Sequence, residues 1–195
     1  MVEETRERIM EATYRALCEQ GYAALTMQDI ADECDCSKSL LHYHFDTKED
    51  LLVALLAHLL ERFEDRVPVD DGDPRGQLVE LVELFVFGGD RDLDEHRAFN
   101  TAMLELRAQA PHNEAFRRQL AENDAHVHAT VAAVVERGIE SGAFREVDPE
   151  RTAAHLLAAI QGARIRWITI GDDAALREVR EALVSDVVDG WLVAG

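Results

Sequence analysis

The stretch that decides the fold is residues 25–52, which read Leu-Thr-Met-Gln-Asp-Ile-Ala-Asp-Glu-Cys-Asp-Cys-Ser-Lys-Ser-Leu-Leu-His-Tyr-His-Phe-Asp-Thr-Lys-Glu-Asp-Leu-Leu. Thr26 and Asp29 are three positions apart and can form a capping box that starts a short helix. Asp35 tolerates a left-handed turn better than most residues other than glycine, and Ser37 can cap a second short helix. Two short helices joined by a turn of three or four residues form a helix-turn-helix.

The rest of the chain is expected to be helical as well, because apolar residues recur at helical spacing and no long run alternates with period two. Gly21 is expected to end the first helix, and the four prolines fall where this periodicity breaks. The predicted class is all-α, with about nine helices in total. They are expected at about 5–18, 27–34, 38–44, 47–66, 75–87, 93–109, 113–140, 149–169 and 173–193.

The charge of the chain is strongly negative. Of its 195 residues 39 are acidic and 20 basic, which gives a formal net charge of −19. Lys38 and Lys48 are the only lysines. Acids spread over a whole chain are often only a solvated surface, but the scarcity of lysine favours adaptation to concentrated salt, as in halophiles. Taken alone, this charge argues against nucleic acid as a partner.

The composition also indicates in which cellular compartment the protein is expected. Hydrophobic residues make up 47% of the chain, which is enough for a core, and no apolar run is long enough to span a membrane. The first residues show no secretory leader, and three cysteines do not suggest a disulfide framework. A cytoplasmic globular protein without membrane association is therefore expected.

Within the motif the charge pattern reverses. Between Cys36 and Phe45 there is no acid, while Lys38, His42 and His44 fall there. Both lysines of the chain lie inside or next to the second short helix, where compact positive charges can meet phosphates. Within this motif, therefore, the sequence favours nucleic acid as a binding partner.

The N-terminal 52 or so residues resemble the tetracycline-repressor (TetR) family of transcriptional regulators. The features that carry this resemblance form an ordered set: Thr5-Arg6-Glu7-Arg8-Ile9, Gly21-Tyr22, Leu25-Thr26, Asp29-Ile30-Ala31, Ser37-Lys38-Ser39, Tyr43-His44-Phe45 and Lys48-Glu49-Asp50-Leu51. Three departures stand out: Cys34-Asp35-Cys36 in the turn, Ser39 in place of a common glycine, and His42 where tyrosine is frequent.

The resemblance implies a DNA-binding domain at residues 1–47, and a helical ligand-binding and dimerisation domain at 48–195. Helix 38–44 would enter the major groove of a double-stranded operator. The residues expected to reach bases or phosphates are Lys38, Ser39, His42 and Tyr43. Those expected mainly to contact the DNA backbone are Thr26, Gln28, His44 and Lys48, and Ser37 completes the predicted DNA-binding set.

The resemblance also implies an apolar cavity among the C-terminal helices, which would take a small hydrophobic or acyl-type effector. Core packing is the simpler explanation for any single apolar member of the set, and a hydrogen-bonded or solvent-facing side chain for His126. The candidate effector-binding residues are Phe85, Phe99, Met103, Asn123, His126, Arg164 and Trp167.

The resemblance further implies a homodimer that forms through the last two helices. Their small residues, and their apolar residues on more than one face, agree with this expectation. The candidate interface residues are Leu157, Ala158, Gly162, Val184, Val188 and Trp191.

The prediction is a ligand-responsive regulator, a repressor in the family's manner, that binds a palindromic operator as a homodimer. The alternatives left open are a DNA-binding regulator without a ligand and a helical protein-binding adaptor. No catalytic motif is found, so an enzyme is not expected. No metal or cofactor is expected either, since the two His-x-His pairs point apart on a helix and Cys34 and Cys36 occupy packing positions.

Overall fold

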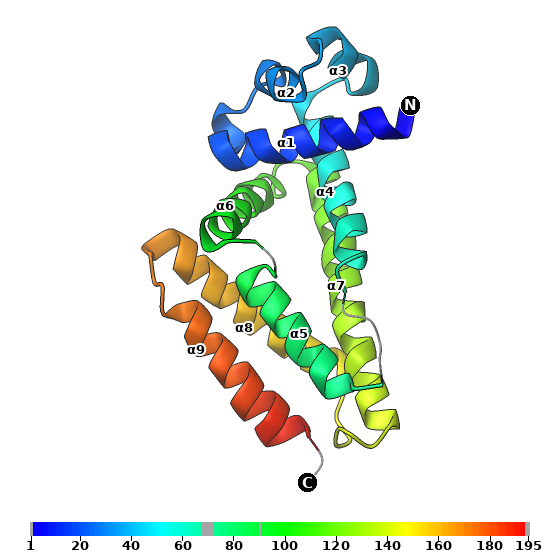
Figure 1. Cartoon of the computed structure of the whole chain (residues 1–195), viewed down its shortest axis with the longest axis vertical. Coiled ribbons are helices and arrows are strands. Elements are labelled where there is room, and N and C mark those ends of the chain that lie inside the picture. The colour runs from blue at the N-terminus through cyan, green and yellow to red at the C-terminus, as the bar shows by residue number, and fades with distance from the viewer. Residues whose placement is uncertain (1, 68–71, 90, 194–195) are drawn as a thin grey trace. The chain divides into compact units, whose positions relative to one another are not determined.

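The computed structural model describes residues 2–67, 72–89 and 91–193, and this part of the chain folds as nine α-helices followed by a π-helix (Figure 1). The all-α prediction is confirmed. The elements are α1 (Val2–Ala24), α2 (Met27–Cys34), α3 (Lys38–His44), α4 (Lys48–Glu64), α5 (Pro74–Phe87), α6 (Leu93–Gln109), α7 (Glu114–Glu140), α8 (Pro149–Ile170), α9 (Ala175–Glu181) and η1 (Ala182–Leu192). None of the described helices is long and apolar enough to cross a membrane.

The chain forms two compact units. The first contains residues 1–66 and 97–123, and the second contains residues 67–96 and 124–195. The first unit thus holds the helix-turn-helix together with most of α6 and the beginning of α7. The compact units do not divide at residue 47, because α4 packs with α1 rather than starting a separate body. The functional boundary at 47 stays a prediction.

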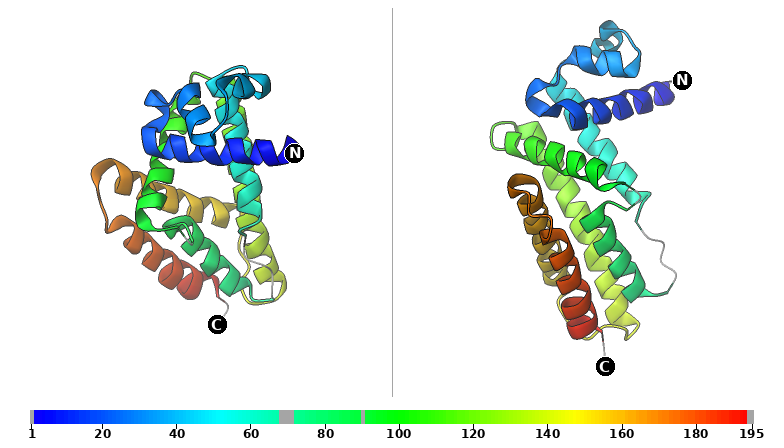
Figure 2. Two further views of the ribbon diagram at one scale, coloured as in Figure 1. Left: turned by 45° about the horizontal axis from the view of Figure 1, so that its top comes forward. Right: turned by 60° about the vertical axis from the view of Figure 1, so that its left-hand side comes forward.

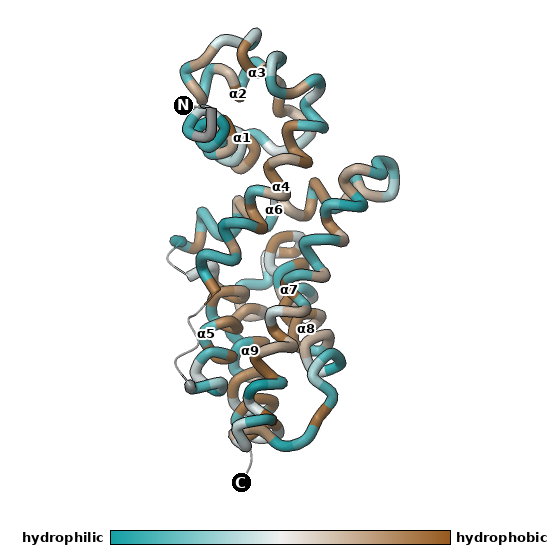
Figure 3. The backbone as a smooth tube through the Cα atoms, turned by 90° about the vertical axis from the view of Figure 1, so that its right-hand side faces the viewer, coloured by the Kyte–Doolittle hydropathy of each residue, from teal (hydrophilic) through white to brown (hydrophobic). Residues whose placement is uncertain are grey.

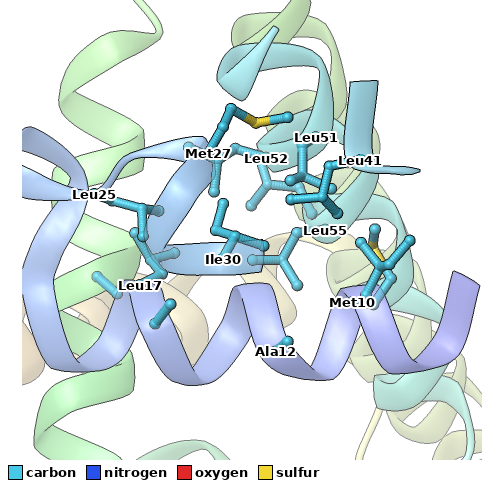
Figure 4. Packing of buried hydrophobic residues seen from close by; sticks show 14 of the residues in the cluster. Met10, Ala12, Leu17, Leu25, Met27, Ile30, Leu41, Leu51, Leu52 and Leu55 are labelled. Atoms are coloured by element: carbon cyan, nitrogen blue, oxygen red, sulfur yellow. The ribbon is translucent and has the colours of Figure 1, made fainter. Parts of the chain in front are cut away.

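In the first unit, α2 and α3 lie on one side of α1, and α4 leads away from α3 (Figures 1 and 2). Side chains of these helices meet in one apolar cluster (Figure 4). Ile30 and Ala31 of α2 are completely buried in it. Leu41 of α3 and Leu51 and Leu55 of α4 are also completely buried. Because each short helix contributes only a few apolar side chains, α2 and α3 depend on α1 and α4 to exclude water.

The turn between α2 and α3 has the predicted left-handed residue. Asp35 has φ 50° and ψ 47°, and its amide donates to carbonyls of the last turn of α2. Ser37 then caps α3, its Oγ accepting from the amide of Leu40 at 3.1 Å. The capping box at the start of α2 is present with both of its hydrogen bonds. The local sequence signals of the helix-turn-helix are therefore confirmed.

The first helix differs from its expected end. Gly21 has φ 74° and ψ 163°, so the backbone bends there, and one further helical turn follows to Ala24. A Cβ at Gly21 would lie 2.9 Å from the Glu105 carboxylate of α6. Positive φ and this close approach both require glycine.

In the second unit, α8 packs against α9, which continues into η1, and α5 packs against all three (Figure 2). Along α7 and α8 hydrophobic residues recur between hydrophilic ones, as expected for helices with one face in a core (Figure 3). The predicted helix 173–193 is present, but from Ala182 onward it is a π-helix, with the wider i→i+5 winding. Its end is held by hydrogen bonds from Arg145 N to Leu192 O at 2.8 Å and from Val193 N to Val188 O at 2.9 Å.

Gly138 of α7 allows the chain to double back after this helix. The ring of Phe144, only 3% exposed, lies against it, and a Cβ on Gly138 would fall 1.9 Å from the ring. We expect Gly138→Ala to lower the free energy of unfolding by about 1–3 kcal/mol through overpacking. Urea denaturation measures this, and the double variant Gly138→Ala/Phe144→Leu should recover part of the loss. A Gly138→Ala protein as stable as the parent would contradict the prediction.

Candidate nucleic-acid interface

The outward face of α3 carries the predicted base-reading side chains. Lys38, Ser39 and His42 are exposed, and Tyr43 is 83% exposed, which is unusual for a large aromatic residue in a helix. Leu41 on the opposite face is completely buried. The His44 ring is also exposed and lies edge-on to Tyr43, with 5.1 Å between the ring centroids. A helix anchored on one side that presents positive, hydroxyl and aromatic groups on the other can bind a DNA groove.

The predicted DNA-contacting residues that precede α3 form hydrogen bonds with residues three or four positions further along the chain. The Thr26 hydroxyl donates to Asp29 Oδ2 at 2.6 Å and accepts from the Asp29 amide at 3.3 Å, while Ser37 caps α3. The Gln28 amide donates to Asp32 Oδ1 at 2.8 Å, one turn further along α2. All three side chains are exposed. Because each already holds a local hydrogen bond, a phosphate would meet them in the orientation that this bond fixes.

The acidic residues of α2 also accept hydrogen bonds from neighbouring side chains. Hydrogen bonds from the Thr26 hydroxyl and backbone lower the pKa of Asp29, since they favour its charged form. Glu33 accepts from Arg15 Nε of α1 at 2.6 Å. The negative charges of α2 are thus tied into caps and pairs, and α3 itself carries no acid.

Lys48 does not project freely. Its Nζ donates to the carbonyls of Tyr22 and Leu25, at 2.9 and 3.0 Å, and lies 4.4 Å from the centroid of the Tyr22 ring. These contacts bind the ammonium to the connection between α1 and α2. The sequence pattern alone could not reveal them, since the partners are backbone atoms 26 and 23 positions away.

The two cysteines of the turn are packed. Cys34 is buried, and burial of Cys36, together with its hydrogen bond to Cys34, raises the pKa of the Cys36 thiol to about 11. A thiol with that pKa is protonated at neutral pH and is a poor nucleophile or metal ligand. In the described part of the chain no group of three or more potential metal-ligating side chains is found. These observations favour the packing interpretation.

Three candidate effector-binding residues belong to the first unit. Phe99 packs against Tyr14, with ring centroids 6.0 Å apart, and Met103 packs on the apolar cluster of α1–α4. Asn123 Nδ2 donates to Leu56 O at 2.8 Å, and its Oδ1 accepts from Gln119 at 3.0 Å. Each therefore has a structural contact of its own within this unit.

The other candidates belong to the second unit. Arg164 Nη2 donates to the carbonyl of Phe85, and its guanidinium lies 6.0 Å from the centroid of that ring, so these two residues are brought together. Trp167 is 2% exposed and stacks on His96, with 5.5 Å between ring centroids. His126 is half-buried, and its carbonyl accepts from Thr130 at 3.0 Å.

Sequence reasoning missed His96. Its Nε2 lies 3.0 Å from the carbonyl of Val86, and a Cβ on Gly88 would meet its ring at 2.4 Å. The signal was present in the Gly88-Gly89 pair that follows α5, because Gly88 has φ 84° and lets the chain approach the histidine closely.

The candidate interface residues fall into two groups. Ala158, Gly162 and Trp191 are exposed and Leu157 is half-buried, and a Cβ on Gly162 would meet open space. Val188 is completely buried and Val184 is 8% exposed, so both pack inside the chain itself. In the π-helix these two side chains face the core, so the exposed members of the candidate set are Ala158, Gly162 and Trp191.

Comparison with known proteins agrees with this architecture. Residues 9–55 match the family "Bacterial regulatory proteins, tetR family", and residues 74–193 match "BetI-type transcriptional repressor, C-terminal". The chain is 32% identical over 189 residues to the HTH-type transcriptional regulator TtgR of Pseudomonas putida, covering 89% of this chain and 85% of that protein. It is 28% identical over 192 residues to the regulator BetI of Rhizobium meliloti, covering 97% of this chain and 90% of that protein.

Two solved structures are similar over nearly the full length. A TetR transcription regulator from Haloarcula marismortui is 41% identical with a TM-score of 0.87, covering 97% of this chain and 99% of that one. A putative transcriptional regulator from Saccharomonospora viridis, solved in complex with choline, is 26% identical with a TM-score of 0.83, covering 99% of this chain and 100% of that one. With its N-terminal helix-turn-helix and BetI-type C-terminal helices, the chain belongs to the TetR family of transcriptional regulators.

Proposed function

We propose that the protein is a ligand-responsive repressor that acts as a homodimer on a palindromic DNA operator in the cytoplasm. The observation that carries the proposal is the exposed face of α3, where Lys38, His42 and Tyr43 stand free of acids on a helix whose other face is locked in the core. Two such helices in a dimer would meet two half-sites about 34–36 Å apart.

Replacing Tyr43 with Phe or Lys38 with Ala is expected to change sequence preference as well as affinity. Both side chains are exposed and point away from the core, so neither change should affect folding. We expect each to cost about 1–3 kcal/mol at the operator and to relax preference at one operator position. Binding to a series of point-mutated operators measures this. Equal losses on every sequence would assign these side chains to phosphates instead of bases.

The effector is proposed to bind among the C-terminal helices and to lower operator affinity by favouring a conformation that binds DNA less well. The apolar character of Phe85 and Trp167 supports a small hydrophobic or acyl-type molecule. A second candidate is a quaternary ammonium compound, favoured by the choline complex of the similar Saccharomonospora viridis regulator. Aromatic rings are the groups that bind such cations.

The test has two steps. Sequencing the genomic DNA fragments that the purified protein retains would identify the operator, and retention of random fragments only would contradict a specific repressor. Operator release is then measured with choline and with fatty acids of increasing length, with tryptophan fluorescence as a second signal. Release by one class identifies the effector chemistry. Release by neither, at millimolar concentration, would favour a regulator that needs no ligand of these classes.

A further inference from the structure

We propose that Lys38 is a modification site, at which acylation of the side-chain amine by an activated acyl donor releases the protein from its operator. This inference rests on the proposed function of α3 as the helix that reads DNA. It adds a covalent form of regulation that acts on the reading helix itself. That regulation is separate from the effector proposed to bind among the C-terminal helices.

The chain uses lysine only at the start of the reading helix and at the start of the helix that follows it. Lys38 and Lys48 are the only lysines, and the other 18 basic residues are arginines. A guanidinium stays protonated and is a poor nucleophile, whereas a lysine amine is a common target of acylation. The one permanent cation of α3 is therefore of the kind that can be chemically modified.

The amine of Lys38 is accessible. The side chain is exposed, and its ammonium forms no ion pair or hydrogen bond with any other residue that the structure describes. No acid lies on α3, and His42, one turn further along, is exposed as well. The acids of α2 hold the hydrogen bonds described above and leave this amine uncovered. An anionic acyl donor can approach an exposed cation on an acid-free helix.

The second lysine is less accessible in the free protein. Lys48 is half-buried, and its Nζ donates to the carbonyls of Tyr22 and Leu25 at 2.9 and 3.0 Å. An acyl donor would have to displace both contacts to reach the nitrogen. These contacts belong to the free protein, so they do not conflict with the predicted contact of Lys48 with DNA phosphate in the complex. Of the two lysines, Lys38 is therefore the one open to acylation before DNA binds.

The reaction is an acyl transfer to nitrogen. The ammonium loses a proton to solvent, and the Nζ lone pair then attacks the carbonyl carbon of the donor. The bond from this carbon to the leaving group breaks, and the leaving group departs as phosphate from an acyl phosphate or as thiolate from a thioester. A second proton leaves the nitrogen for solvent. The product is a neutral amide, so each event removes one positive charge from α3.

Loss of this charge should weaken operator binding, because α3 carries no other lysine or arginine. A lost contact of this kind typically costs about tenfold or more per subunit, so a dimer modified on both subunits should bind roughly a hundredfold more weakly. The fold should not change, since the side chain is exposed. Lys38→Gln, which is neutral like the acylated residue, is expected to show a similar loss.

Acylation of the full chain tests which amine reacts. The probes are acetyl phosphate and acetyl-coenzyme A, used separately, and peptide mass spectrometry locates the acetyl groups. In the free protein we expect Lys48 to react about tenfold or more slowly than Lys38, because its ammonium is held by two hydrogen bonds. Bound operator DNA should protect Lys38. Labelling by one probe only identifies the donor class. Equal labelling of both lysines, or no labelling of Lys38, would overturn the proposal.

Arg118→Lys supplies a matched control on α7. Arg118 is exposed, and its guanidinium likewise forms no ion pair or hydrogen bond within the described part of the chain. Glu122 lies one turn further along, where α3 has His42. Lys38 should be acetylated about twofold or more faster than the introduced lysine, because an acid at this spacing repels an anionic donor. Equal rates would show that any exposed lysine reacts, and would overturn a specific site.

Operator affinity, measured by fluorescence anisotropy before and after acetylation, tests the regulatory step. Lys38→Arg retains a cation but offers no amine at this position, so treatment should leave its own starting affinity unchanged. Equal losses for Lys38→Arg and the parent would place the effect at another site and overturn the proposal. An acetylated parent that binds as before would also overturn it, while operator binding itself stands. If the untreated parent binds no operator, the proposed repressor function fails, and regulation through Lys38 fails with it.

Discussion

Gly162→Trp is expected to yield monomers that lose high-affinity operator binding. Gly162 is exposed on α8 with open space around its Cα, one turn beyond the exposed Ala158. On the same helix Ile165 is 41% exposed, and on η1 Trp191 is also 41% exposed. Large apolar side chains beside a stripe of small residues suit close approach of a second copy. An indole at Gly162 would hold the two copies apart.

The loss should be large because a dimer binds two half-sites together. Joining two binding modules typically raises affinity by about 10²–10⁴ over one module, so a monomer should lose binding by a comparable factor. Light scattering gives the mass, and fluorescence anisotropy gives the operator affinity. Ala129→Trp, at an exposed position of α7, is the control and should remain dimeric. An intact Gly162→Trp dimer would show that the interface lies elsewhere.

Operator binding is expected to persist at molar salt. A protein that neutralises Z phosphates loses affinity with a slope of about −0.9Z in log–log salt. Each subunit presents few cations around the helix-turn-helix, so we take Z as about 4–6 per dimer. The formal charge of −19 per chain doubles in a dimer, and this charge repels the duplex at low salt. Salt that competes for phosphates therefore also removes a repulsion.

We expect affinity to vary weakly, or to rise, between about 0.1 and 2 M potassium chloride, where the Debye length falls from about 10 Å to below 3 Å. Tm should climb over the same range, because the acids of the folded chain repel one another less. Anisotropy with a labelled operator and thermal unfolding monitored by circular dichroism measure the two effects. A steep loss of affinity over several decades would show that ordinary counterion release dominates, and would remove the basis for the salt-adaptation hypothesis.

Local signals in the sequence predicted the helix-turn-helix well. The Thr26–Asp29 capping box, the left-handed Asp35 and the Ser37 cap act over three or four residues, and each is found where the pattern places it. Helical periodicity placed the longer helices for the same reason, since an apolar face repeats within one helix. The exposed face of α3 follows from this, once Leu41 is assigned to the core.

Contacts between distant segments could not be predicted from such signals. Lys48 binds carbonyls, which every residue possesses, so no residue type marks its partners. The stacking of His96 on Trp167 joins positions 71 apart in the chain. The burial of Val184 and Val188 depends on the winding of η1, and an ordinary α-helix would distribute these side chains differently around the axis.

Several acidic side chains of the first unit hold structural hydrogen bonds, and this limits which acids can be replaced to reduce the negative charge of the protein. Asp29 and Asp50 complete the capping boxes of α2 and α4, and Glu105 accepts a hydrogen bond from the Tyr22 amide. These carboxylates therefore maintain the starts of two helices and the backbone path after Gly21. A variant made for work in dilute buffer should therefore keep them and exchange exposed acids elsewhere, such as Asp46 beside α3, for neutral residues. Because the folded state lowers the pKa of Asp29, its cap contributes stability above the unfolded pKa, and that contribution is lost as the pH falls through the folded pKa. Neutralising the surface by substitution thus preserves caps that neutralising it by acidification would destroy.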